Sequence, residues 1–358
     1  MSPQTVLVTG ANGFIGSAVC RAFSLAGWTT YGLTRSDKSA ADLSREEVTP
    51  IIGSPADPSK FLSKLPAIDV IVSCSEDINN YEAHFKDVLS MIRQICAQRL
   101  KTKTQRQTGS EKPNQKPLVI FTSGCKDYGM TPRHGEPGLA PHTEDSPLRP
   151  PPVLVKRCES ALQILTAYTA EFDCIVTRPT TLYGRTGSFY SLLFLAADQA
   201  KTASNGALQI PSTPDSILHG AHVDDVGAAY VAMATAPREV VAGQAYNISA
   251  HRYETLGEIM TVVEQVHGVK VSYVDSHPGT DFQTVLKPVV DFPQWVGSDK
   301  LRRDTGWTDQ KPLFHEGYQV YRNAYNVAAQ ENSEQYLRVK RIANGPIFGS
   351  GSAKAWGR

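Results

Sequence analysis

The chain has 358 residues, 41% of them hydrophobic, with 36 Lys and Arg against 35 Asp and Glu. This length predicts one large α/β domain with a smaller domain beside it. The near-zero net charge gives no electrostatic reason to expect a nucleic-acid partner or an anionic membrane surface. Without a long apolar run or a signal-like start, the sequence favours a cytoplasmic protein that does not span a membrane.

Metal binding is not indicated by the sequence. The six cysteines are scattered without a Cys-x-x-Cys pair, which predicts reduced and mostly buried thiols. His222 stands close to Asp224 and Asp225, but neighbouring side chains diverge, so we expect no metal there. Asp225 is predicted instead to cap the helix that it opens.

The amino-terminal segment predicts a dinucleotide-binding turn. An apolar, β-branched run ending at Thr9 leads into a glycine-rich stretch and then into residues with helical spacing. Gly10 permits the tight turn, Gly13 lets the backbone approach a pyrophosphate, and Gly16 lets helix and strand pack closely. The N–H groups at the start of the helix then face the phosphates. The residues expected to bind cofactor here are Gly10, Asn12, Gly13, Phe14, Ile15 and Gly16.

Buried strands alternate with helices through the first half of the chain. Near-continuous apolar strands separated by helices predict a doubly wound, Rossmann-type parallel sheet covered on both faces. Ser73, Cys74 and Ser75, at the end of the fourth strand, are expected to pass the cofactor ribose. The predicted strands are Thr5–Thr9, Thr29–Leu33, Ile51–Ile52, Asp69–Ser73, Lys116–Thr122 and Cys174–Thr177, and the predicted helices begin near Ser17 and span Tyr81–Gln98.

Three further segments have loop-like composition. Lys101–Lys116 is polar and basic without interleaved aromatic residues, which indicates a solvated surface insertion. Met130–Pro152 is rich in Pro, Gly and His and is predicted to be a long ordered loop or a lid. Ala343–Arg358 is Gly- and Ser-rich with little apolar periodicity, and we expect it to be mobile.

The end of the second strand favours NADP over NAD. NAD-binding proteins often carry an acidic residue there that accepts hydrogen bonds from the ribose diol, and this chain has none at the strand tip. Arg35 offers a fork of donors suited to a 2′-phosphate, with the hydroxyl of Ser36 beside it. Asp37 is close enough to argue against this interpretation, so NAD stays the alternative.

Several later segments, taken in order, resemble the extended short-chain dehydrogenases/reductases of the nucleotide-sugar epimerase/dehydratase type. The similarity covers about residues 4–310. Such proteins hold cofactor in an amino-terminal Rossmann domain and substrate under a smaller, discontinuous cap. The resemblance thus implies a sheet domain at 1–180 plus about 220–248, a cap at 181–219 plus about 249–330, and a tail at 331–358. The segments that carry it are Thr122–Gly129, Arg178–Gly184, His222–Val226, Gly243–Ile248 and Leu301–Trp307.

The resemblance also implies a catalytic Tyr with a Lys four residues later, and a Ser or Thr that polarises the substrate oxygen. It assigns the lysine to Lys156, also a ribose contact, with Arg157 as the alternative if the register is off by one. The tyrosine position then falls on Pro152, which cannot ionise.

The other family positions are altered as well. The hydroxyl position falls on Gly124, with Ser123 adjacent as a substitute. Asp87 stands where the family usually has an asparagine, and it could pair with Lys156 or act as a base. Pro179 and Thr181 are expected near the cofactor. In these departures the sequence resembles the branch of the family called atypical short-chain dehydrogenases.

Three functions remain open from the sequence. The first is an NADP-dependent oxidoreductase acting on a small organic carbonyl, alcohol or sugar-like substrate, because the cofactor itself carries the hydride chemistry. The second is a non-redox isomerase, epimerase or lyase on the same fold. The third is a catalytically silent NADP-binding sensor. Tyr128, Tyr183, His134 and His142 are candidate substitutes for the missing acid, with Ser123, Lys156, Asp87 and Tyr128 the predicted catalytic set. Extended relatives often pair through two helices, which makes a homodimer compatible with the resemblance.

Overall fold

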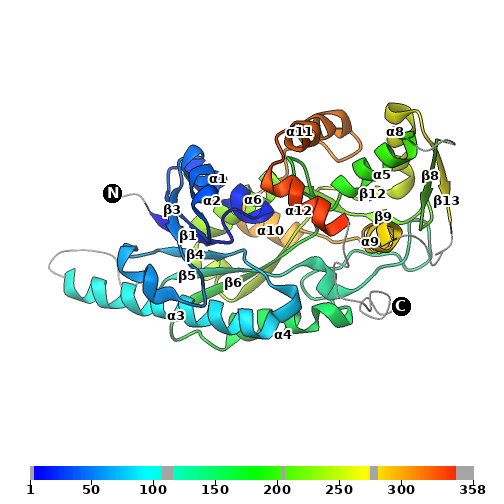
Figure 1. Cartoon of the computed structure of the whole chain (residues 1–358). Helices are drawn as coiled ribbons and strands as arrows, with labels where there is room; N and C mark the ends of the chain where they lie inside the picture. The colour runs from blue at the N-terminus through cyan, green and yellow to red at the C-terminus, as the bar shows by residue number, and fades with distance from the viewer. Residues whose placement is uncertain (1–3, 107–115, 203–205, 275–280, 344–358) are drawn as a thin grey trace.

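The computed structural model describes residues 4–106, 116–202, 206–274 and 281–343, and its centre is a seven-stranded parallel sheet (Figure 1). The spatial order β11-β6-β5-β4-β1-β2-β3 reverses direction between β1 and β4. This is the doubly wound order predicted from the alternating strands and helices. The strands are β1 (Thr5–Thr9), β2 (Thr29–Thr34), β3 (Thr49–Ile52), β4 (Val70–Ser73), β5 (Leu118–Thr122), β6 (Asp173–Pro179) and β11 (Gln244–Ile248).

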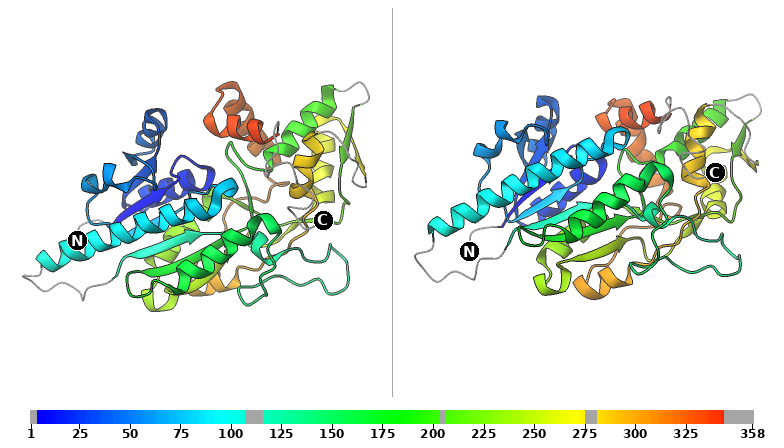
Figure 2. Two further views of the ribbon diagram at one scale, coloured as in Figure 1. Left: turned by 60° about the horizontal axis from the view of Figure 1, so that its bottom comes forward. Right: turned by 90° about the horizontal axis from the view of Figure 1, so that it is seen from below.

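Helices cover both faces of this sheet (Figures 1 and 2). One face packs against α1 (Phe14–Leu25), α2 (Asp37–Arg45) and α6 (Val223–Thr235), and the other against α3 (Tyr81–Arg106) and α4 (Val155–Thr166). The two hydrophobic clusters lie on opposite sides of the strands, so apolar residues alternate between them. Val6 and Val8 of β1 face the α1 side, whereas Leu7 faces the α3 side.

A second core forms the cap. It is rich in aromatic side chains, with Tyr183, Tyr190, Phe194, Phe314 and Tyr318 buried against one another. The apolar segment after residue 188 therefore contributes mainly to the hydrophobic core of the cap. The cap contains α5 (Ser191–Thr202), β8 (Ala207–Ile210), β9 (Ile217–Leu218), β12 (Glu254–Thr255), α8 (Leu256–His267), β13 (Lys270–Tyr273), α9 (Asp281–Val290), α11 (Tyr318–Gln330) and α12 (Glu334–Ala343).

Short elements connect the two parts. A helix, α7 (Arg238–Val241), precedes β11, and a two-stranded pair joins β7 (Thr181–Tyr183) to β10 (Gly220–His222). The helix α10 (Asp299–Thr305) packs with Trp307 against the sheet core, although the sequence assigned this stretch to the cap. The sequence-based boundary at about 249 is therefore crossed by a segment that returns to the sheet.

Two other predictions need correction. The helix expected over Tyr81–Gln98 continues to Arg106, so the first residues of the predicted insertion are helical, and 107–115 lie outside the described residues. The tail expected from residue 331 instead forms α12, whose Val339 and Ala343 are buried in the cap core. Residues 344–358, the remainder of that tail, also lie outside the described part.

The predicted long loop, 130–152, is ordered against the cap. Its backbone donates to the 293–295 segment, from Thr131 to the Pro293 carbonyl and from His142 to the Trp295 carbonyl. At its far end the Arg149 N–H donates to the Asp127 carbonyl oxygen at 2.8 Å. The loop thus links the end of β5 to the cap.

All six cysteines are free thiols, and five of them are buried, as predicted. Cys74 is partly exposed, and burial of its sulfur raises the pKa of the thiol to about 12. None of the helices within the described ranges has the length and apolar character needed to span a membrane.

A buried histidine ties the β9–β10 connection to two other segments. Nδ1 of His219 accepts the Val296 N–H at 3.1 Å, and Nε2 lies 3.0 Å from the Ala250 carbonyl oxygen. The neutral tautomer with a proton on Nε2 satisfies both bonds. Burial, together with the nearby Arg302 charge, lowers the pKa of His219 to about 4.

We expect His219 to cause acid destabilisation. Above pH 6.5 the ring is neutral in both states, whereas between 6.5 and about 4 the unfolded chain binds a proton that the folded chain excludes. This difference removes about 3 kcal/mol of the unfolding free energy across that window. Urea unfolding of the wild type and of His219→Asn at neutral pH and near pH 4 measures it. The asparagine keeps an acceptor for Val296 and cannot ionise, so its loss should be smaller; identical losses would contradict the assignment.

Candidate functional site

The glycine turn has the geometry that a diphosphate requires. Gly10 adopts φ +62°, and a Cβ there would lie 2.9 Å from the Cys74 carbonyl oxygen. A Cβ on Gly16 would lie 2.1 Å from the Gly10 carbonyl oxygen. Side chains are therefore excluded at both positions, as the motif predicted. A Cβ on Gly13, before the start of α1, would meet only the Gly10 oxygen at 3.0 Å and Nη1 of Arg338 at 3.9 Å among the described residues beyond its own turn of the chain.

This cradle fits the phosphates of a dinucleotide. The first turn of α1 has unpaired N–H groups and a positive dipole end, and no side chain at Gly13 obstructs access to them. Phe14 and Ile15 pack part of their side chains against the sheet core, which leaves their backbone at the turn. The residues predicted at this turn are therefore assembled as the motif requires.

The neighbouring strand ends carry the other predicted cofactor contacts. Cys74 and Ser75 lie directly against Gly10, and the Thr9 hydroxyl donates to Ser75 Oγ at 3.2 Å. Ser73 is buried. Pro179 ends β6 and Thr181 begins β7, so both lie at the carboxyl edge of the sheet.

The predicted 2′-phosphate site is exposed at the end of β2. Arg35 and Ser36 are both exposed. The Ser36 hydroxyl caps α2, because it accepts the Ser39 N–H at 3.3 Å. Asn12 donates to Ser39 Oγ at 3.1 Å, and this bond ties the glycine turn to α2.

A buried ion pair occupies the end of β5, where the resemblance places catalytic groups. The Asp127 carboxylate is completely buried. It accepts a hydrogen bond from Ser123 Oγ at 2.5 Å and from Nη2 of Arg157 at 2.7 Å. Nε of Arg178 lies 4.0 Å from Asp127 Oδ2, the carboxylate oxygen that Ser123 binds. The Ser123 hydroxyl therefore lies beside a fixed guanidinium.

Arg157 has a second acidic neighbour. Glu76, in the loop after β4, lies 3.7 Å from Nη1 of Arg157. Burial opposes the charge of Arg157, but the carboxylates of Asp127 and Glu76 outweigh it and raise the pKa of the guanidinium. A Cβ at Gly124 would lie 3.2 Å from Arg157 Nη2, so the glycine gives the guanidinium room to approach the strand end.

Lys156, the lysine that the resemblance assigns, lies at the surface. Its side chain is 54% exposed and pairs with Glu82 at 3.2 Å and Glu159 at 3.3 Å. Arg157, the alternative register, is the cation that faces the β5 end. The predicted pairing of Asp87 with Lys156 is also not found among the described contacts. With Arg157 in the lysine position, the tyrosine position falls on Val153 instead of Pro152, and neither residue can ionise.

Tyr128 does not fit the role of an acid. Its ring is buried, its hydroxyl donates to Asn247 Oδ1 at 2.9 Å, and the hydroxyl accepts from Arg178 Nη1 at 3.0 Å. Burial raises the pKa of this phenol. His142 stacks on the same ring, and His134 is bound to the Tyr253 hydroxyl at 2.9 Å. These three candidates therefore hold the loop in place.

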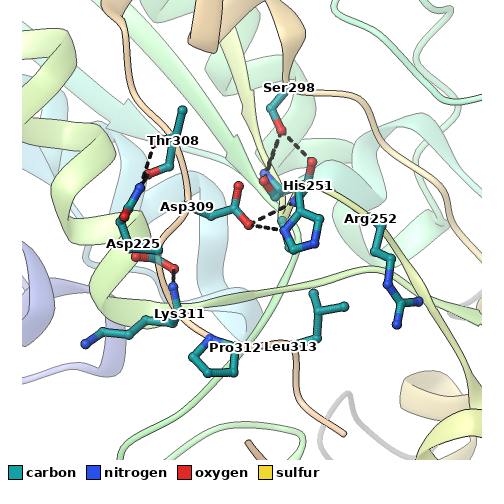
Figure 3. Close-up of polar contacts among 12 residues, drawn as sticks. Asp225, His251, Arg252, Ser298, Thr308, Asp309, Lys311, Pro312 and Leu313 are labelled. Atoms are coloured by element: carbon teal, nitrogen blue, oxygen red, sulfur yellow. Dashed lines mark hydrogen bonds and ion pairs between the residues drawn. The ribbon is translucent and has the colours of Figure 1, made fainter. Parts of the chain in front are cut away.

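Asp225 has a different partner from the one predicted (Figure 3). His222 caps α6 by accepting the Asp224 N–H at 3.1 Å, whereas the Asp225 carboxylate accepts the Lys311 N–H at 2.9 Å. Asp224 forms ion pairs with Arg21 at 2.9 Å and Arg185 at 2.7 Å. The two carboxylates point to different partners, so this turn is a structural junction between the sheet domain and the 308–313 segment.

A family model for the NAD-dependent epimerase/dehydratase family matches residues 6–249. The chain belongs to this family. None of the curated proteins matches the sequence significantly.

Solved structures of similar fold cover nearly the whole chain. A dTDP-glucose 4,6-dehydratase from Bacillus anthracis, in complex with NAD, superposes with a TM-score of 0.68 at 18% identity, covering 94% of this chain and 99% of that one. A UDP-glucose 4-epimerase from Bifidobacterium longum, with NAD+ and UDP, gives 0.65 at 15% identity, covering 93% and 100%. A UDP-glucuronic acid 4-epimerase from Bacillus cereus gives 0.63 at 17% identity, covering 90% and 99%. At these identities the structures establish a common fold.

Three groups of the site were missed from the sequence. Asp127, Glu76 and Tyr81 were not named as site residues. Tyr81, at the start of α3, lies close enough to Glu76, Arg157 and Asp127 for their charges to act on it, and burial raises the pKa of its phenol. The apolar strand before Asp127 was the available signal, because a short turn after such a strand places polar side chains at the sheet edge.

Removing Asp127 should be strongly destabilising. Asp127→Ala leaves the buried Arg157 guanidinium without its main partner, which costs about 3–5 kcal/mol of unfolding free energy. The matched control is Glu82→Ala, which breaks the exposed pair with Lys156 and should cost less than about 1 kcal/mol. Denaturant unfolding followed by circular dichroism measures both. Similar small losses would show that the Asp127 pair is not a structural requirement.

Proposed function

We propose that the protein binds a nicotinamide dinucleotide, preferentially NADP, and transfers hydride between it and a small organic carbonyl, alcohol or sugar-like substrate. The observation that carries the proposal is the open cradle at Gly13, bounded by two positions where side chains are excluded. The solved structures of similar fold were determined with NAD, which agrees with this class of cofactor. The preference for a 2′-phosphate rests on exposed Arg35, since no acidic side chain stands at the tip of β2.

The bound nicotinamide would supply or accept the hydride, and the chain must stabilise the charge on the substrate oxygen. Arg157 carries a permanent positive charge that Asp127 holds in one orientation. Such a guanidinium can stabilise an oxyanion but cannot release a proton at physiological pH. Arg157 can therefore provide the electrostatic stabilisation that the family's lysine provides. It does not replace the acid that donates the proton.

The proton must then come from a hydroxyl beside Arg157. Ser123 donates its single hydroxyl proton to Asp127, so it can polarise a substrate oxygen only by exchanging this hydrogen bond. Tyr81 is the candidate donor among the described groups around this ion pair, because it is only partly buried and no described residue forms a hydrogen bond with its hydroxyl. The Tyr128 hydroxyl, by contrast, is bound to Asn247 and Arg178. The sequence analysis named Ser123 for this site and did not name Tyr81.

A silent binding protein is the second candidate. Asp127 is fully buried and already accepts from both Ser123 and Arg157, so this carboxylate is not available as a base. A protein of this kind would bind the dinucleotide tightly without turnover. Turnover assays distinguish the two.

Arg35→Ala should separate the two cofactors. We expect the Kd for NADP+ to rise about tenfold while the Kd for NAD+ changes less than about twofold, because only NADP+ carries the 2′-phosphate. Calorimetric titration of both nucleotides measures this, with Arg45→Ala, at the other end of α2 and paired with Asp42, as the control. Equal weakening of both nucleotides would refute the role of Arg35, and no binding of either by the wild type would refute the proposed function.

Turnover is tested with NADPH or NADP+ and a panel of aldehydes, ketones and alcohols, followed by nicotinamide absorbance. Ser123→Ala and Tyr81→Phe should each lower kcat/KM by about 100-fold, the effect of losing a polarising or acid group. Lys156→Ala should leave it unchanged, because this side chain is exposed and pairs with surface glutamates. Binding without absorbance change would favour the silent protein, and product without absorbance change would favour an isomerase.

A further inference from the structure

The carboxy-terminal helix α12 lies beside the glycine turn (Figure 1). Gln335 donates from Nε2 to Ser17 Oγ of α1 at 3.3 Å and accepts from the Thr186 hydroxyl. A Cβ on Gly187 would lie 2.7 Å from Gln335 Cβ, so the helix packs closely on the β7–α5 connection. Val339 anchors the next turn in the cap core. The helix is therefore fixed to both the sheet domain and the cap.

Arg338 of this helix is placed at the phosphate cradle. Its Nη1 is the one side-chain atom within 4 Å of the ideal Cβ of Gly13, at 3.9 Å, in the part of the chain that the structure describes. The side chain is exposed, and no carboxylate among the described residues pairs with it. Arg341, one turn later, is by contrast bound to Glu334 at 2.7 Å. The donors of Arg338 are thus available to a ligand at the turn.

Two further cations, Arg35 and Lys38, come from the end of β2 and the start of α2. The pKa of Glu334 is lowered mainly by its hydrogen bond from Arg341, and the charge of Lys38 contributes, which places α2 close to the start of α12. Arg35 is exposed just before Lys38 in sequence. A dinucleotide carries its diphosphate charge at the centre and, in NADP, a further phosphate near β2. Arg338 lies near Gly13, and Arg35 follows the end of β2.

We propose that Arg338 binds the pyrophosphate of the dinucleotide, so that α12 closes the cofactor groove above the glycine turn. The proposal rests on the proposed function, namely that the chain binds a nicotinamide dinucleotide. A guanidinium presents paired N–H donors that match two phosphate oxygens, whereas the turn itself supplies only backbone N–H groups. Because NAD and NADP share the pyrophosphate, Arg338 should serve both equally, unlike Arg35.

Calorimetric titration of the full chain with NAD+ and with NADP+ tests the contact. Arg338→Ala should raise the Kd for both nucleotides about tenfold, and Arg338→Lys should raise it less, since the charge is kept and the fork is lost. Lys340→Ala, an exposed cation of the same helix, is the matched control and should change neither Kd by more than about twofold. The thermal midpoint without ligand should not differ between Arg338→Ala and the wild type, because the side chain is exposed.

Hydrogen exchange gives a readout independent of affinity. Saturating NADP+ should slow exchange of the α12 amides in the wild type, and the slowing should be much reduced in saturated Arg338→Ala. Wild-type binding with equal affinity for Arg338→Ala and no protection of α12 would overturn this inference and leave the proposed function standing. Failure of the wild type to bind either nucleotide would overturn both.

Discussion

The ion pair between Asp127 and Arg157 is the constraint on which the structure at the end of β5 depends. Asp127 is fully buried, and Ser123 and Arg157 are both bound to it. The guanidinium fits beside the strand end because Gly124 has no Cβ, which would lie only 3.2 Å from it. A serine at 124 would press on Arg157, and a buried arginine without Asp127 would be an uncompensated charge. The residues at positions 123, 124, 127 and 157 therefore form one coupled unit.

This coupling changes the chemistry available at the end of β5. A lysine beside a tyrosine lowers the phenol pKa and lets a proton shuttle, whereas a guanidinium paired with a carboxylate keeps its charge at all relevant pH values. The charge can stabilise an oxyanion while the proton has to move through a separate hydroxyl. Ser123, at the β5 end, is bound to this pair, and Tyr81, at the start of α3, lies close enough for the charges of the pair to act on its phenol.

The fold could be predicted because its signals are local. Apolar strand residues, the glycine turn and the later motifs each predict their own element, and their order gives the doubly wound sheet. The site depended on contacts distant in sequence. Lys156 and Arg157 are adjacent, and on a helix that difference turns a side chain by about 100°, so the short turn Pro152–Leu154 before α4 decides which cation faces inward. Asp127 could not be assigned from the sequence because its partner Arg157 lies on another element.

The same reasoning explains how α12 reaches the glycine turn. Two carboxylates hold the segment that leads to α11 through its backbone: Asp225 accepts the Lys311 N–H, and Glu254 accepts the N–H groups of Phe314 and His315. Asp309, within the segment, accepts the His251 N–H through its own carboxylate (Figure 3). These bonds fix where α11 starts on the cap. Since Val339 packs in the cap core and Gln335 is bound to α1, α12 spans the two parts of the molecule. Movement of the cap relative to the sheet would displace Arg338 from Gly13, so the phosphate contact proposed for Arg338 depends on the position of the cap.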